Sequence, residues 1–128
     1  MVKRIGLLTG GGDCGGINAM IEAAVKSATN EEWIVDGIKK GWEGAIFDYR
    51  RILTVSDVDG IHSETGTILG TSRTNPYNFT GEVGGRQFVE GDVSRHIIEN
   101  ARGAGLEAII VCGGDDTLSV IPRLIKDH

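Results

Sequence analysis

Short apolar runs alternate along this chain with segments whose apolar positions recur every three or four residues. Residues 4–9 (RIGLLT) form an apolar run that glycines end, as is typical of a buried parallel strand. Residues 33–38 predict a second short strand, and residues 107–112 (EAIIVC) predict the clearest one. Strands that alternate with helices predict an α/β fold, with a parallel sheet and helices on both of its faces.

Helices are predicted where apolar side chains recur on one face. The expected helices cover residues 17–28, 93–101 and 118–125, with a further helical turn at 41–46. Pro122 falls inside the last of them, so that helix is either kinked there or begins later, with Ser119 as its cap. Residues 47–91 show no clear period and predict an irregular, polar segment. Because that is long for an idle connection, we expect it to carry function.

Two glycine–aspartate loops each follow a predicted strand and precede a predicted helix. They are residues 10–16 (GGGDCGG) and 113–117 (GGDDT). Ligands of open parallel sheets sit at the carboxyl ends of the strands, and glycine-rich turns into helices offer backbone amides to a phosphate. Carboxylates repel phosphate, so Asp13 and Asp115 suggest a bridging Mg²⁺, which binds both. The alternative is that these aspartates only cap helices.

Two further side chains are candidates for ligand contact. Arg73, in residues 66–76 (GTILGTSRTNP), could bind a phosphate with two parallel hydrogen bonds, or it could be a solvated loop arginine. Trp42 could stack on a planar base or sugar face, or it could be half-buried packing.

Composition excludes several classes of protein. The chain has 128 residues, a net charge of −5 and no lysine or arginine cluster, which argues against a non-specific nucleic-acid surface. No apolar run approaches the roughly 18 residues that span a bilayer, and no signal peptide is recognisable, so we expect a cytoplasmic protein without membrane contact. In that reducing compartment Cys14 and Cys112 are expected to be free, small packing residues.

Four segments, in this order, resemble the phosphofructokinase family. They are residues 5–19 (IGLLTGGGDCGGINA), 37–44 (GIKKGWEG), 66–76 (GTILGTSRTNP) and 110–117 (IVCGGDDT). The resemblance covers nearly the whole chain and keeps strand, loop and order together. It implies that residues 1–128 form the amino-terminal, phosphoryl-donor-binding domain of such an enzyme.

The resemblance also assigns residues to the donor site. It implies contacts to the donor's phosphates from Gly11, Gly12 and Arg73. Gly114 and Thr117 would line the donor site.

A metal ligand and a clue to the donor follow in the same way. Asp115 takes the place of the family's Mg²⁺ ligand, and Trp42 takes the place of an aromatic side chain beside adenine in ATP-using members. Asp116 stands where ATP-using members resemble GGDGS or GGDGT, whereas pyrophosphate-using members commonly carry aspartate. A carboxylate there fills space and repels an α-phosphate, by about 1 to 4 kcal/mol for like charges about 4 Å apart. Bulky Val120 and Ile121 point more weakly the same way.

We therefore expect a part of a 6-phosphofructokinase that transfers a phosphoryl group from pyrophosphate to the 1-hydroxyl of fructose 6-phosphate in glycolysis. ATP is the alternative donor. No catalytic base is expected in this chain, because the family's catalytic aspartates follow beyond the position of His128, so residues 1–128 alone would be inactive. The family's shared sites imply a homo-oligomer. Alternatives of other classes are a non-catalytic phosphate-binding module and a diacylglycerol- or NAD-kinase-type domain, against which the first and third segments argue.

Overall fold

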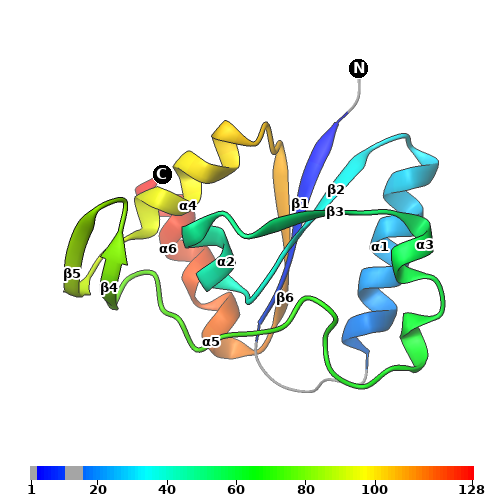
Figure 1. Ribbon diagram of the computed structural model, residues 1–128, viewed down its shortest axis with the longest axis horizontal. Coiled ribbons are helices and arrows are strands. Elements are labelled where there is room, and N and C mark those ends of the chain that lie inside the picture. The colour runs from blue at the N-terminus through cyan, green and yellow to red at the C-terminus, as the bar shows by residue number, and fades with distance from the viewer. Residues whose placement is uncertain (1–2, 11–15) are drawn as a thin grey trace.

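The computed structural model describes residues 3–10 and 16–128. Within them a four-stranded sheet has the order β3-β2-β1-β6. Its strands are β1 (Arg4–Gly10), β2 (Ile34–Ile38), β3 (Arg50–Leu53) and β6 (Ala108–Gly113). The central strand β1 pairs in parallel with β2 and β6, whereas β3 runs antiparallel to β2 (Figure 1).

Helices cover both faces of this sheet, as expected. On one face lie α1 (Ile17–Asn30) and α3 (Val55–Val58), and on the other lie α2 (Trp42–Phe47), α4 (Ser94–Gly103) and α6 (Val120–Asp127) (Figure 1). Each face buries its own apolar cluster. Leu7 of β1 belongs to the cluster under α1, and its neighbour Leu8 belongs to the cluster under α2 and α4. This division follows from the alternation of side chains along a strand.

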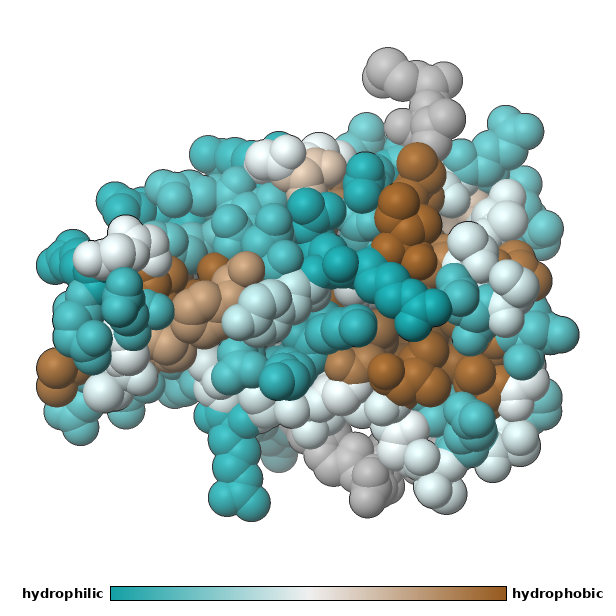
Figure 2. Space-filling model, viewed as in Figure 1, coloured by the Kyte–Doolittle hydropathy of each residue, from teal (hydrophilic) through white to brown (hydrophobic). Residues whose placement is uncertain are grey.

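The expectation of an irregular segment over residues 47–91 holds for residues 64–78 and is wrong for the rest. The rest contains β3, α3, a 3₁₀ turn (Ile61–Ser63) and a hairpin of β4 (Phe79–Val83) with β5 (Arg86–Gly91). These strands are short and mostly exposed, so they carry no run of buried positions. Figure 2 shows a hydrophilic band that crosses the view at β3, with hydrophobic surface on either side of it. The predicted parallel sheet is present in β2, β1 and β6, and β3 adds an antiparallel edge strand that the pattern did not indicate.

The last predicted helix is divided in two. The short turn α5 (Asp115–Leu118) precedes α6, which begins at Val120 with Ser119 at its cap position. Pro122 therefore lies in the first turn of α6, where a missing N–H breaks no intrahelical hydrogen bond. Of the two alternatives drawn from the sequence, the later start is confirmed.

The ends of β1 and β6 approach each other very closely. Gly10 and Gly113 are paired in the parallel register, and the side chain of Thr117 packs onto both of them. A Cβ atom added at Gly10 would lie 2.3 Å from the Thr117 hydroxyl oxygen, and one added at Gly113 would lie 2.2 Å from the Gly10 carbonyl oxygen. Only glycine at both positions allows this contact.

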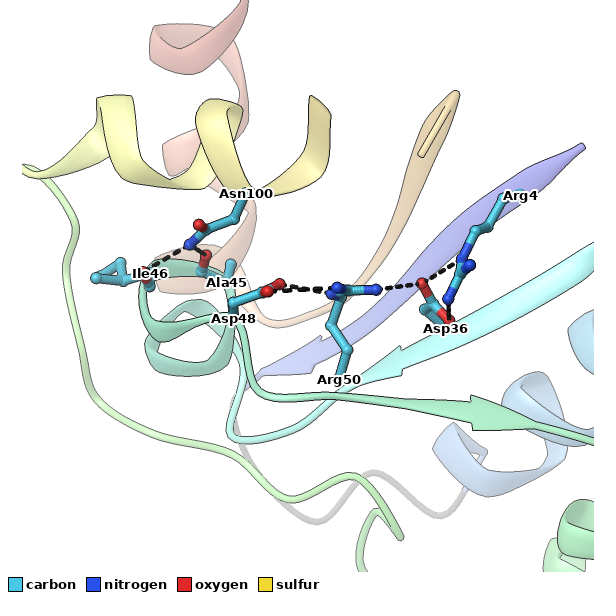
Figure 3. A network of polar contacts seen from close by, with 7 residues as sticks. All are labelled: Arg4, Asp36, Ala45, Ile46, Asp48, Arg50 and Asn100. Carbon is cyan, nitrogen blue, oxygen red and sulfur yellow. Dashed lines mark hydrogen bonds and ion pairs between the residues drawn. The ribbon is translucent and has the colours of Figure 1, made fainter. Parts of the chain in front are cut away.

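A cluster of ion pairs around a buried carboxylate joins β1, β2 and β3. The Asp36 carboxylate, 1% exposed on β2, accepts two hydrogen bonds from the Arg4 guanidinium, at 2.8 and 2.9 Å, and one from Arg50 at 2.9 Å (Figure 3). The bonds to Asp36 raise the pKa of the Arg4 guanidinium, while burial partly opposes this shift. Nearby, the Asn100 amide donates to the carbonyls of Ala45 and Ile46 at the end of α2. These contacts join β1, β2, β3, α2 and α4.

We expect Gly10→Ala to lower the free energy of unfolding by about 1–3 kcal/mol, because overpacking displaces the Thr117 side chain. Thr117→Ala removes the two atoms that would clash most, so the double variant should recover part of that loss. Urea denaturation measures the free energy of unfolding of the two single variants and of the double variant. Gly103→Ala is the matched control, since nothing lies within 4 Å of a Cβ there. Equal losses in the single and double variants would contradict the packing described.

Asp36→Asn should cost about 3 kcal/mol of unfolding free energy, because removing one partner of a buried ion pair leaves charge uncompensated. On the same sheet, Arg51→Gln breaks the pair with Asp57, where the Arg51 side chain is 55% exposed, and should cost less than about 1 kcal/mol. Chemical denaturation of both variants at neutral pH compares them. Similar losses for the two would show that the Asp36 cluster adds nothing beyond surface pairing.

Candidate functional site

The segment before Arg73 is fastened to the carboxyl end of the sheet. The hydroxyl of the fully buried Thr9, the penultimate residue of β1, lies 2.7 Å from that of Thr67 and donates to the Gly70 carbonyl at 3.2 Å. The Ser72 hydroxyl donates to the Lys40 carbonyl at 2.8 Å, just after β2. Buried polar groups need such partners, so these bonds select one path for the loop.

Asn18 holds the same segment from the other side, and sequence reasoning missed it. This buried residue of α1 donates from its amide nitrogen to the carbonyls of Glu64 and Gly66, and its amide oxygen accepts from the Ile68 N–H at 3.0 Å. A polar residue on the apolar face of α1 was the signal that could have revealed this role. The partners lie about fifty positions away, so the pattern alone does not identify them.

The second wall of the site is the turn α5. Gly114 occupies its cap position, and the exposed Asp115 and Asp116 form its first turn. The turn is closed by hydrogen bonds from the Leu118 N–H to the Gly114 carbonyl, at 3.0 Å, and from the Ser119 N–H to the Asp115 carbonyl, at 2.8 Å. The pairing of β1 with β6 places this turn beside the end of β1.

A cleft of about 520 Å³ lies between these two walls. It is lined by Trp42, Ser72, Arg73, Thr74, Asn75, Asp116, Thr117 and Ser119. Four of the residues predicted from the sequence, namely Trp42, Arg73, Asp116 and Thr117, are thus brought together although they come from three separate segments. A guanidinium, a carboxylate and several hydroxyl and amide groups on one cleft suit a charged, oxygen-rich ligand.

The other predicted residues lie differently. Gly114 and Asp115 precede Asp116 in the same turn but are not among the residues that line the cleft. Gly11 and Gly12 lie outside the described residues, as do Asp13 and Cys14.

Trp42 is not exposed in the way expected of a side chain that stacks freely on a base or sugar face. It is 5% exposed, and its indole N–H donates to the Thr117 carbonyl at 3.1 Å. The bulky residues considered as a barrier to a nucleotide do not line the cleft. Val120 is buried in the core under α2 and α4, and Ile121 packs against that core.

Two further expectations concern the rest of the chain. Cys112, the residue before Gly113, is a free, partly buried thiol, and burial raises its pKa. No helix in residues 3–10 and 16–128 is both long and apolar enough to cross a membrane.

Comparisons with known proteins identify the family of this chain. The sequence profile of the phosphofructokinases matches residues 4–128. A pyrophosphate–fructose 6-phosphate 1-phosphotransferase of Amycolatopsis methanolica is 41% identical over 97% of this chain and 33% of its own length. An ATP-dependent 6-phosphofructokinase of Chloroflexus aggregans is 40% identical over 97% of this chain and 34% of its own.

A solved structure shares the fold. The phosphofructokinase of Pichia pastoris in the T-state superposes with a TM-score of 0.84 and 27% identity, over 99% of this chain and 13% of that one. The chain spans about a third of the length of the curated relatives it matches. With a family profile matched from the first strand to the last residue, and a cleft built from the segments that carry the resemblance, this chain belongs to the phosphofructokinase family.

Proposed function

We propose that this chain is the donor-binding part of an enzyme that transfers a phosphoryl group from pyrophosphate to the 1-hydroxyl of fructose 6-phosphate. The observation that carries the proposal is the cleft at the carboxyl edge of the sheet, which Arg73 and Asp116 both line. Phosphoryl transfer asks a protein mainly to position the reactants and to neutralise charge. Arg73 would bind the donor's phosphate oxygens through its planar fork.

Asp116 is the reason to favour pyrophosphate over ATP. Its carboxylate lines the cleft, so a donor with a third phosphate would bring more negative charge towards it. Pyrophosphate avoids that repulsion. Val120 and Ile121 lie in or against the core, so they do not help to decide between the two donors. Among the residues considered, Asp116 alone favours pyrophosphate over ATP. ATP remains the second candidate, since a relative named as ATP-dependent matches the chain nearly as well.

Mg²⁺ fits the acidic turn as an ion shared with the donor. Asp115 and Asp116 offer carboxylate oxygens, which Mg²⁺ prefers, and the ion commonly uses one or two carboxylates together with substrate phosphates. The described residues contain no group of three or more His, Cys, Asp or Glu side chains that could hold a metal alone. Asp115 would be its ligand, and when bound the ion would neutralise donor charge.

The other groups that the reaction needs are not expected within residues 1–128. A base that deprotonates the sugar hydroxyl, and most of the fructose 6-phosphate site, would come from other regions of a longer enzyme or from a second subunit. A glycolytic role would place that homo-oligomeric enzyme in the cytoplasm. Residues 1–128 by themselves would bind donor without turning it over.

The full-length gene product should phosphorylate fructose 6-phosphate with pyrophosphate and Mg²⁺, and much more slowly with ATP. A coupled assay that follows fructose 1,6-bisphosphate with each donor in turn measures this. Robust turnover of ATP with none of pyrophosphate would overturn the choice of donor. Turnover of neither would favour a phosphate-binding module over an enzyme.

Asp116→Gly should shift donor preference towards ATP by at least about tenfold in kcat/KM, because removing a nearby like charge is worth about 1–4 kcal/mol. Asp116→Asn removes the charge but keeps the size of the side chain. A shift in both variants identifies charge as the cause, whereas a shift in the glycine variant alone identifies space. If neither shifts, another residue sets the donor.

A further inference from the structure

Trp42 lies where the two walls of the cleft meet. It is the first residue of α2, and the preceding Gly41 adopts a φ of +57°. A Cβ atom at Gly41 would lie 3.0 Å from the Thr9 carbonyl oxygen, so glycine lets α2 begin against the end of β1. This close approach sets the place of the Trp42 ring within the described fold.

The wall of the cleft formed by α5 is held in part by the Trp42 indole. The Trp42 N–H and the Thr117 carbonyl form a buried hydrogen bond across 75 positions of sequence. Thr117 belongs to α5, a turn of four residues, and so short a helix has little stability of its own. The turn is held by the packing of the Thr117 side chain on Gly10 and by this bond to its carbonyl. Loss of the indole N–H would leave a buried acceptor without that donor.

The other wall is tied to the residues just before Trp42. The Lys40 N–H donates to the Leu69 carbonyl at 2.9 Å, and the Lys40 carbonyl accepts from the Ser72 hydroxyl at 2.8 Å. Ser72 directly precedes Arg73. The segment of residues 40–42 therefore contacts both the loop that carries Arg73 and the turn that carries Asp116.

We propose that Trp42 is a positioning residue that sets the spacing between Arg73 and Asp116 through its hydrogen bond to Thr117. The proposal rests on the proposed function, in that the ligand of the cleft is a phosphoryl donor. Trp42 acts through the main chain of α5, so its N–H matters even for a donor that has no base to stack on its ring. Trp42→Phe separates the two roles, because phenylalanine keeps an aromatic face but has no N–H.

In the full-length gene product, Trp42→Phe should raise KM for pyrophosphate about tenfold, which corresponds to about 1.4 kcal/mol. The same variant should leave KM for fructose 6-phosphate unchanged, which a general loss of stability would not do. Trp33→Phe is the matched control. Trp33 is half-buried beside the other core, with Lys3 over its ring, and it should leave both constants unchanged.

The indole proton itself provides a second measurement that needs no folded variant at position 42. By NMR on the indole-¹⁵N-labelled full-length gene product, the assigned Trp42 N–H should exchange slowly with solvent and shift when pyrophosphate is added. An unchanged KM for pyrophosphate in Trp42→Phe, or a Trp42 N–H that exchanges fast and does not respond to pyrophosphate, would overturn the inference. Turnover of neither donor by the unmodified gene product would instead overturn the proposed function.

Discussion

The contact between the ends of β1 and β6 is the constraint on which the site depends. Parallel pairing brings Gly10 beside Gly113, and the absence of side chains there lets the Thr117 side chain fill the space above them. That contact, together with the bond from the Trp42 indole to the Thr117 carbonyl, fixes the turn that carries Asp115 and Asp116 beside β1. Gly10 and Gly113 thus serve the packing of the strand ends. This role is separate from any contact that neighbouring glycines make with a ligand.

The opposite wall is ordered by buried polar side chains. Thr9 and Asn18 are almost fully buried, and each bonds to the segment around residues 64–70. Because an unsatisfied buried polar group is costly, these bonds favour one conformation of a loop that has little regular structure. Arg73 follows this ordered segment, so a long connection can hold a charged side chain at a defined place on the cleft.

The buried ion-pair cluster and the candidate site use different residues of the central strand. Arg4, the first residue of β1, joins the buried Asp36 and Arg50, whereas Gly10, the last residue of β1, belongs to the wall of the cleft. Ligands of open parallel sheets bind at the carboxyl ends of the strands, and the candidate cleft lies at that edge of the sheet. Asp116 of α5 thus lines the cleft with an exposed side chain, whereas the buried Asp36 carboxylate is paired with Arg4 and Arg50.

The sequence by itself determined the central strands and the main helices, because buried parallel strands and amphipathic helices leave strong periodic patterns. The prediction that Trp42, Arg73, Asp116 and Thr117 share one site came from the resemblance of their segments to a family, and these four residues line one cleft. It did not reveal β3 or the hairpin, whose exposed residues carry no such pattern. Only the tertiary structure decided that the Trp42 indole bonds to the Thr117 carbonyl and that Asn18 holds residues 64–68. Those partners are far apart in the chain, so a local pattern cannot identify them, and the packing of the sheet brings them together.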